Sequence, residues 1–216
     1  MSQKLDLISA PAVPAPHLLK DEGQALLLPQ NVWFVGTANH DETTKDFADK
    51  TYDRAHVMEL PRHREEFDLT KCRERSPISL HALQNAFEDA YDKHQPKADE
   101  AYKFLERQLA EILSRHFRIS WGNRLERQLN YYIPVVIAGG GSIGEAVDHI
   151  VATKLIRKLR DRHSNRPEDV QLLHRQLREG LSALDPGWVS RTSPDDVRSL
   201  VMLREELRRL GAQVDE

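Results

Sequence analysis

The stretch NVWFVGTANHDETTKDFADKTYDR, residues 31–54, decides which fold the sequence predicts. It opens with an apolar run, Val32 to Val35, whose β-branched and aromatic residues are typical of a buried strand. Gly36 and Thr37 end this run, and polar residues follow from Asn39 to Asp41. Ligands of open α/β sheets bind just beyond the carboxyl ends of the strands, so these polar residues form a candidate binding site.

The second half of the stretch predicts a short polar helix that ends in Tyr52-Asp53-Arg54. A second apolar run, from His56 to Leu60, follows this helix and stops at Pro61. Its composition again favours a strand. The complete unit is therefore predicted as strand, polar tip, short helix, arginine and strand, and residues 25–29 predict a further short strand before it.

This order of motifs resembles the sensor-1 and arginine-finger segment of AAA+ NTPases, and most closely that of the McrB-like branch. In that branch a strand ends in G-T-x-N, an acidic residue follows, and a D-x-x-x-x-R pattern precedes the next strand. The matching residues are Gly36-Thr37-Ala38-Asn39, then Asp41, then the run from Asp49 to Arg54. The match depends on the whole string in this order, because each piece alone is common.

The resemblance implies roles for four residues. Asn39 would be the sensor-1 residue that orients the attacking water near the γ-phosphate, and Arg54 the arginine finger offered to a neighbouring subunit. Thr37 and Asp41 would be further nucleotide-binding residues. An amide can donate to a phosphate oxygen and accept from water, and a guanidinium can neutralise charge on the equatorial oxygens. The ordinary alternatives are a turn asparagine and a solvated surface arginine.

Beyond Pro61 the sequence predicts helices, because apolar residues recur at spacings of three and four. Ser76-Pro77 is expected to start the first long helix and Pro96 to break it. Ser142 and Glu145 form a capping box at the start of a later helix. The apolar positions at helical spacing include Leu80, Leu83, Phe87, Leu105, Leu109, Leu125, Leu129, Val147, Ile150, Leu173, Leu177, Leu200 and Leu203.

This helical region resembles the lid that follows the core of AAA+ proteins. In McrB-like proteins a short turn followed by Arg opens a lid helix, and Arg124, after Trp121-Gly122-Asn123, is the matching residue. The resemblance implies that Arg124 is a sensor-2 residue that binds nucleotide. A later lid helix of the family carries an x-D-x-x-x-x-x-K pattern, which Asp148 and Lys154 match. An arginine at a helix start is also common without any such role.

Two parts of an AAA+ core are absent from the sequence. No G-x-x-x-x-G-K-[ST] motif occurs, and no apolar strand that ends in Asp-Glu precedes Asn31. The resemblance therefore covers only the family's C-terminal half, from about Leu26 to about Arg162, and implies a chain that is inactive alone. A truncated gene product, a split protein and an excised fragment all remain open as explanations.

The expected fold is an α/β fragment, the C-terminal part of an AAA+ core, followed by an α-helical lid, so that the chain is mostly α overall. Residues 1–66 would be the part of the core with sensor 1 and the arginine finger, residues 67–165 the lid, and residues 166–216 a helical extension. Within that extension Asp185-Pro186-Gly187 predicts a turn, and residues 193–196 predict the start of the last helix.

A glycine run after residue 138 offers a competing interpretation. Gly139, Gly141 and Gly144 satisfy G-x-G-x-x-G between an apolar stretch and a helix, as in dinucleotide-binding folds. Pro134 within the apolar stretch and the absence of a following strand argue against that fold. The run also fails as a phosphate loop, because Glu145 stands where Lys is needed. We therefore expect a turn between two lid helices.

Composition excludes some classes of protein. Acidic and basic residues are nearly balanced, with a formal net charge of −3, so the total charge does not indicate a general nucleic-acid binder. The single cysteine, Cys72, forms no intramolecular disulfide and no cysteine-cluster zinc site. The sequence contains no apolar run of membrane-spanning length. Its first residues show no basic region followed by an apolar core, so we expect no signal peptide. A cytoplasmic protein is expected.

The resemblance implies ATP or GTP with Mg²⁺ as ligands, bound mainly by the absent N-terminal half or by a neighbouring subunit. It further implies hydrolysis in a homo-oligomeric ring with complete AAA+ subunits, with a nuclease partner in DNA restriction or defence by family analogy. The alternative is a non-catalytic helical interaction or scaffold protein derived from an AAA+ domain. A dinucleotide enzyme is a distant third.

Overall fold

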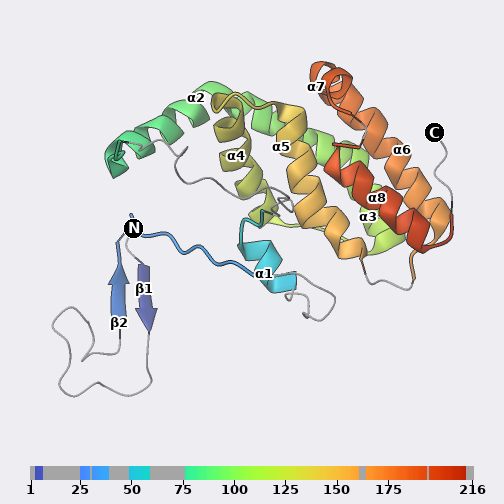
Figure 1. Cartoon of the computed structure of the whole chain (residues 1–216), viewed down its shortest axis with the longest axis horizontal. Coiled ribbons are helices and arrows are strands. Elements are labelled where there is room, and N and C mark those ends of the chain that lie inside the picture. The colour runs from blue at the N-terminus through green and yellow to red at the C-terminus, as the bar shows by residue number, and fades with distance from the viewer. Residues whose placement is uncertain are drawn as a thin grey trace, which may run out of the picture. The chain divides into compact units, whose positions relative to one another are not determined.

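The computed structural model describes residues 3–6, 25–29, 31–38, 49–58, 76–160, 164–193 and 195–212. The chain divides into two units, Met1–Asp46 and Phe47–Glu216. The described strands belong to the first unit and the described helices to the second (Figure 1). The described part is therefore mostly helical, as the sequence predicts.

The first unit contains one pair of short strands. Strand β1 (Gln3–Asp6) pairs antiparallel with β2 (Ala25–Leu28), in a register that places Gln3 opposite Leu28. Strand β2 confirms the short strand predicted over residues 25–29. Ala25 on β2 is fully buried.

The predicted buried strand over Val32–Val35 is wrong. Residues 32–38 have no regular secondary structure, and the exposed fraction rises from 66% at Trp33 to 90% at Val35. A strand forms only where a neighbouring strand satisfies its backbone N–H and C=O groups. Within the described part of this unit, β1 and β2 pair with each other, so the apolar run has no ladder to join. Residues 56–58 of the second predicted strand are likewise irregular.

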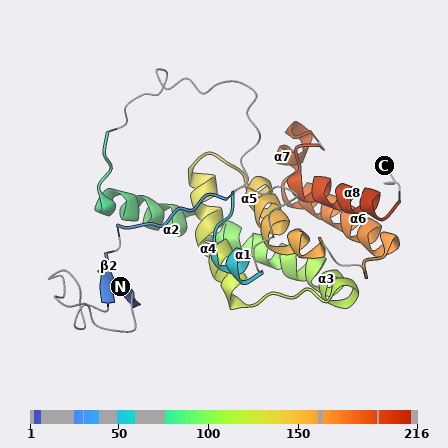
Figure 2. The same ribbon diagram turned by 60° about the horizontal axis from the view of Figure 1, so that its bottom comes forward.

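The second unit is built from helices (Figure 2). Some of these helices continue into π or 3₁₀ turns. The π turns are η2 and η3, and the 3₁₀ turn is η4. In chain order its elements are α1 (Asp49–Arg54), α2 (Leu80–Phe104), η2 (Leu105–Leu109), α3 (Ala110–Phe117), α4 (Asn123–Ala138), α5 (Ile143–Ile150), η3 (Val151–Leu155), η4 (Ile156–Leu159), α6 (Pro167–Leu184), α7 (Pro186–Arg191) and α8 (Arg198–Arg209).

One apolar core holds these helices together. Helix α2 packs along α4, α6 packs along α8, and α5 contacts α4, α6 and α8. From Leu105 onward the side chains at the predicted helical spacing form this core, which confirms the periodicity there and shows that α6 and α8 pack on the preceding helices. Leu80, Leu83 and Phe87, in the first turns of α2, lie outside it, and Phe87 is exposed. Its fully buried members include Leu105, Leu109, Leu129, Ile133, Val147, Ile150, Leu173, Leu177 and Leu203.

The predicted break at Pro96 is wrong, because α2 continues through it. A proline inside a helix removes one backbone hydrogen bond and crowds the carbonyl of the residue four positions earlier. That residue, Asp92, is exposed, so water can satisfy its carbonyl group. Ala98 and Ala101, on the following turns, are fully buried in the core. Packing on the C-terminal side therefore keeps the helix continuous.

Candidate anion-binding pocket

The residues that the resemblance singled out belong to different units of the chain. Asn39 and Asp41 lie outside the described residues, and Thr37 is exposed and irregular in the first unit. Arg54 is the exposed last residue of α1, and Arg124 is exposed in the first turn of α4. Arg54 and Arg124 therefore belong to the second unit, and a pocket lies beside Arg124.

This pocket has a volume of about 510 Å³, within the range of small-molecule sites. One wall comes from residues 120–122, which connect α3 to α4, and from the first turns of α4. The other wall comes from the turns η3 and η4. The lining residues are Ser120, Trp121, Gly122, Asn123, Arg124, Leu125, Gln128, Lys154, Leu155 and Lys158.

The connection from α3 to α4 explains why backbone N–H groups are available at the pocket. Helix α3 ends at Phe117. The next residue, Arg118, adopts a left-handed conformation with φ of 53°, and buried Ile119 anchors the following loop. Gly122 precedes α4 in an extended conformation, and no side chain caps the helix. The first amides of an α-helix have no partner within the helix, so this end of α4 can donate to a ligand.

The charge of the lining favours an anion. Arg124, Lys154 and Lys158 contribute positive charge, and none of the described lining residues is acidic. The N-terminal end of α4 adds the positive end of the helix dipole. The half-buried side chain of Trp121 supplies an apolar surface beside these cations. The pocket can therefore bind phosphate groups through charge-assisted hydrogen bonds.

Lys154 lines this pocket and also holds α1. The lysine is only 4% exposed. Its Nζ atom donates to the carbonyl oxygens of Tyr52, at 2.6 Å, and Ala55, at 2.5 Å. These carbonyls lie at the C-terminal end of α1, where backbone acceptors lack partners within the helix and a cation is favourable. The guanidinium of Arg157 lies over the ring of Tyr52 and adds a second contact to α1.

Asp148, the other residue of the family pattern, has a structural role. Its carboxylate accepts from the backbone N–H groups of Arg198, at 3.0 Å, and Ser199, at 2.9 Å, and from the hydroxyl of Ser199. It therefore caps the start of α8 from α5. Burial raises the pKa of this carboxyl, although the hydrogen bonds from Ser199 and Arg198 oppose that effect.

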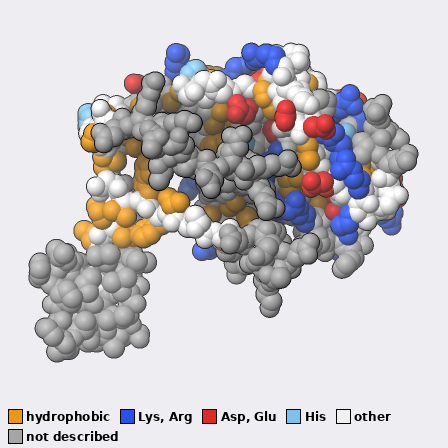
Figure 3. Space-filling view, viewed as in Figure 1, with side chains coloured by type: hydrophobic (Ala, Val, Ile, Leu, Met, Phe, Trp, Pro, Cys, Tyr) orange, Lys and Arg blue, Asp and Glu red, His pale blue; other side chains and the backbone are white. Residues whose placement is uncertain are grey.

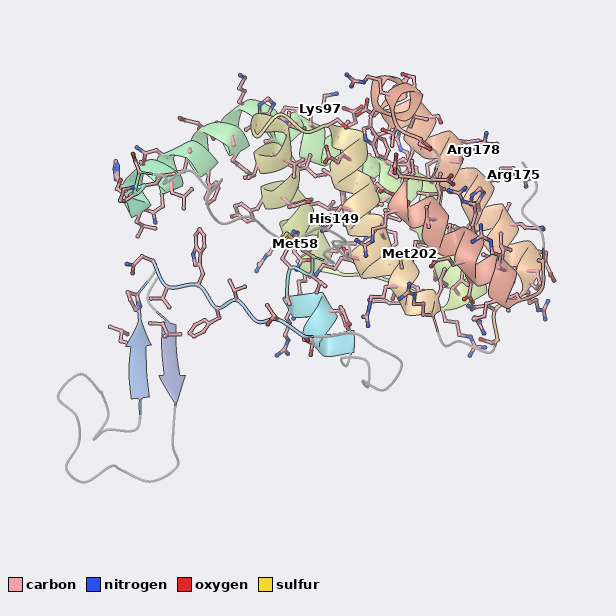
Figure 4. All side chains as sticks on the ribbon, in the orientation of Figure 1. Met58, Lys97, His149, Arg175, Arg178 and Met202 are labelled. Carbon is pink, nitrogen blue, oxygen red and sulfur yellow. The ribbon has the colours of Figure 1, made fainter. Side chains whose placement is uncertain are left out.

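Three rings from distant parts of the sequence meet beside α1. His149 on α5 lies 5.1 Å from His56 and 5.5 Å from Tyr132, between ring centroids. Burial lowers the pKa of His149 to about 4, and the nearby His56, Arg198 and Lys154 add to this effect. Figure 4 shows His149 inside the helical unit. No local spacing in the sequence links His56 to His149, so the sequence alone carries no signal for this contact.

The glycine run forms the predicted turn. Gly140 has φ of 93°, and the N–H groups of Gly140 and Gly141 donate to the carbonyls of Ile137 and Val136 at the end of α4. The Ser142 hydroxyl accepts from the backbone N–H of Glu145, as the capping box predicts. The segment before the run is helix α4 and no strand, so the dinucleotide-binding interpretation is wrong.

Comparison with known proteins identifies no relative of this chain. No protein-family model matches the chain, and neither a curated protein nor a solved structure matches it. Among the described residues no helix has the length and apolar character needed to cross a membrane. The same residues contain no group of three or more His, Cys, Asp and Glu side chains that could hold a metal ion.

Proposed function

We propose that this chain is the C-terminal sensor, arginine-finger and lid portion of an McrB-like AAA+ NTPase, which hydrolyses ATP or GTP in an oligomeric ring. The observation that carries the proposal is the pocket at the start of α4. Arg124, which the resemblance assigns as sensor 2, lines it together with Lys154 and Lys158. A cationic residue at this position of a lid is what a nucleotide's phosphates require.

In the proposed role the pocket binds the phosphate chain, and the rest of the site comes from elsewhere. The Arg124 guanidinium and the Lys158 ammonium would neutralise phosphate oxygens, while the amides at the start of α4 donate to them. Asn39 would orient the attacking water, and Arg54 would reach a neighbouring subunit's nucleotide. The described residues offer no carboxylate cluster for Mg²⁺, so the metal would be held by the absent half or by that neighbour.

The experiment is a calorimetric titration of the chain with inorganic tripolyphosphate, Mg·ATP and Mg·GTP. We expect weak binding of all three anions. The two nucleotides should bind more tightly than tripolyphosphate, because their bases can contact Trp121. Arg124→Gln and Lys158→Met should each weaken binding by about tenfold, the size of a lost charge-assisted hydrogen bond. Arg175→Gln is the matched control, because Arg175 is an exposed arginine of α6 outside the pocket (Figure 4). No binding of any of the three anions would contradict the proposal.

A second candidate is a non-catalytic helical interaction or scaffold protein. Exposed apolar side chains favour it: Tyr131 on α4 is 69% exposed and contacts the ring of Tyr91 on α2, and Phe87 lies one turn earlier on α2. Figure 3 shows side chains of both charge signs over α6 and α8. A chain that associates through these residues and binds none of the three anions would support this candidate.

A further inference from the structure

Helix α1, which carries Arg54, depends on a few contacts with the turns that follow α5. It has six residues, which is too short to be stable alone in water. Among the described elements it packs on η3, and Figures 1 and 2 both show it beside the end of α5. Tyr52 is buried there beneath Arg157. The two hydrogen bonds from Lys154 hold the last turn of α1, immediately next to Arg54.

The same lysine forms part of the pocket wall that contains Arg124 and Lys158. An ammonium binds an anionic oxygen more strongly than a neutral carbonyl, because the hydrogen bond is then between opposite charges. The carbonyl groups at the end of α1 carry the negative end of the helix dipole and disfavour a second negative group close to them. An anion in the pocket and the carbonyl groups at the end of α1 would therefore compete for the ammonium group of Lys154.

We propose that Lys154 is a positioning residue through which pocket occupancy controls α1: an anion bound beside Arg124 draws the Lys154 ammonium from the carbonyls of Tyr52 and Ala55 and loosens the helix that ends in Arg54. The proposal rests on anion binding in the pocket, as in the proposed function. It adds a linkage between the two arginines that the resemblance assigns to different roles. By linkage, α1 docking and anion affinity oppose each other.

The test measures hydrogen exchange of the α1 amides, Ala55 included, while the chain is titrated with inorganic tripolyphosphate. Saturating tripolyphosphate should speed exchange in wild-type α1 by about fivefold or more, the lower end of usual coupling. In Lys154→Met, exchange of α1 should be fast already and unresponsive to the anion. Lys158→Met is the matched control: it should need more anion but reach the same response, because it leaves the carbonyl contacts of Lys154 intact.

Calorimetry on the same samples separates the two proposals. Binding of tripolyphosphate with unchanged or slower exchange in α1 would overturn the linkage and leave the proposed function standing. Absence of binding would overturn both. Amides of α6 and α8 report whether a variant is folded, since these helices share the core. Should Lys154→Met fail to fold, the wild-type titration still decides between the outcomes, and Lys154→Arg, which keeps the charge, should retain the response.

Discussion

Asp148 and Ser199 are joined by a double contact: the carboxylate accepts from both the backbone N–H and the hydroxyl of Ser199. Because Asp148 also accepts from the N–H of Arg198, it satisfies two of the first amides of α8. Asp148→Ala should lower the free energy of unfolding by about 2–3 kcal/mol, since it removes a cap and leaves buried donors unpaired. Asp148→Asn should cost less, because it keeps one oxygen acceptor. Urea denaturation measures both.

Asp195→Ala is the control for this prediction. Asp195 lies three residues before α8, and its side chain is 84% exposed, where it pairs with Arg204. Exposed ion pairs contribute little, so this variant should change the free energy of unfolding by less than about 1 kcal/mol. An equal loss in Asp195→Ala and Asp148→Ala would show that Asp148 is not the main cap of α8.

The last helix shows how far local sequence signals reach. Residues 193–196 predict a helix start, and the Ser193 hydroxyl does accept from the N–H of Asp195, but α8 begins at Arg198. Its cap comes from Asp148, about fifty positions earlier, and no local pattern indicates such a partner. Apolar periodicity predicted the existence of this helix because its own residues carry that signal. The capping contact depends on how α5 and α8 pack.

Gly180 on α6 tests the packing against α2. A Cβ atom at this position would lie 2.5 Å from Cε2 of Phe104, which is buried in the core. In an exposed helix Gly→Ala would stabilise by up to about 1 kcal/mol. We expect the opposite sign for Gly180→Ala, a loss of about 1–3 kcal/mol from overpacking, measured by thermal or urea unfolding.

Gly187→Ala in α7 is the matched control for Gly180→Ala. Its added Cβ would meet only the Asp185 carboxylate, at 3.8 Å, which is an ordinary contact. This variant should be neutral or slightly more stable. A stabilised Gly180→Ala would mean that the Phe104 ring moves aside without loss, and that α2 and α6 pack more loosely than the structure indicates.

His149 should make stability depend on pH. An unfolded histidine takes up a proton near pH 6.5, whereas burial holds the pKa of folded His149 to about 4. Between these pH values the unfolded state binds more protons than the folded state. The free energy of unfolding should therefore fall as the pH is lowered from 6.5 to 4. The fall should be on the order of 2 kcal/mol, because His149 is partly exposed and the full pKa shift overstates the effect. Above pH 6.5 His149 is neutral in both the folded and the unfolded state, so its lowered pKa no longer reduces the free energy of unfolding.

Urea denaturation at several pH values checks this dependence. His149→Phe keeps a ring against Tyr132 and removes the titrating group, so its stability should fall less steeply below pH 6.5. The burial of His56 also lowers the pKa of that residue, so part of the slope should remain. His81→Phe, at an exposed position of α2, should keep the wild-type slope. Identical slopes in the wild type and His149→Phe would contradict this assignment.

The candidate site was predictable only in part. A local motif predicts Arg124 as a site residue, and the structure places it on a pocket wall. No motif indicates that Lys158 lines the pocket or that Lys154 contacts both the pocket and α1, although a spacing of four in a helical stretch places these two lysines on one side. The strand error at residues 32–35 has a different cause. Composition shows that Val32-Trp33-Phe34-Val35 suits a strand, but it carries no information about a neighbouring strand to pair with.

Substitutions of Arg54 and of Arg124 should change different properties: hydrolysis in the first case and anion binding in the second. Arg54 is exposed at the end of α1 and does not line the pocket, so Arg54→Ala should bind tripolyphosphate and Mg·ATP as the wild type does. Arg124→Ala should weaken both by about tenfold. In the complete ring that the proposed function requires, Arg54→Ala should abolish hydrolysis while nucleotide binding is nearly unchanged, because the finger acts on a neighbour's phosphate. Full hydrolysis by Arg54→Ala would contradict the arginine-finger assignment. Equal anion affinities of Arg124→Ala and the wild type would contradict the sensor-2 assignment.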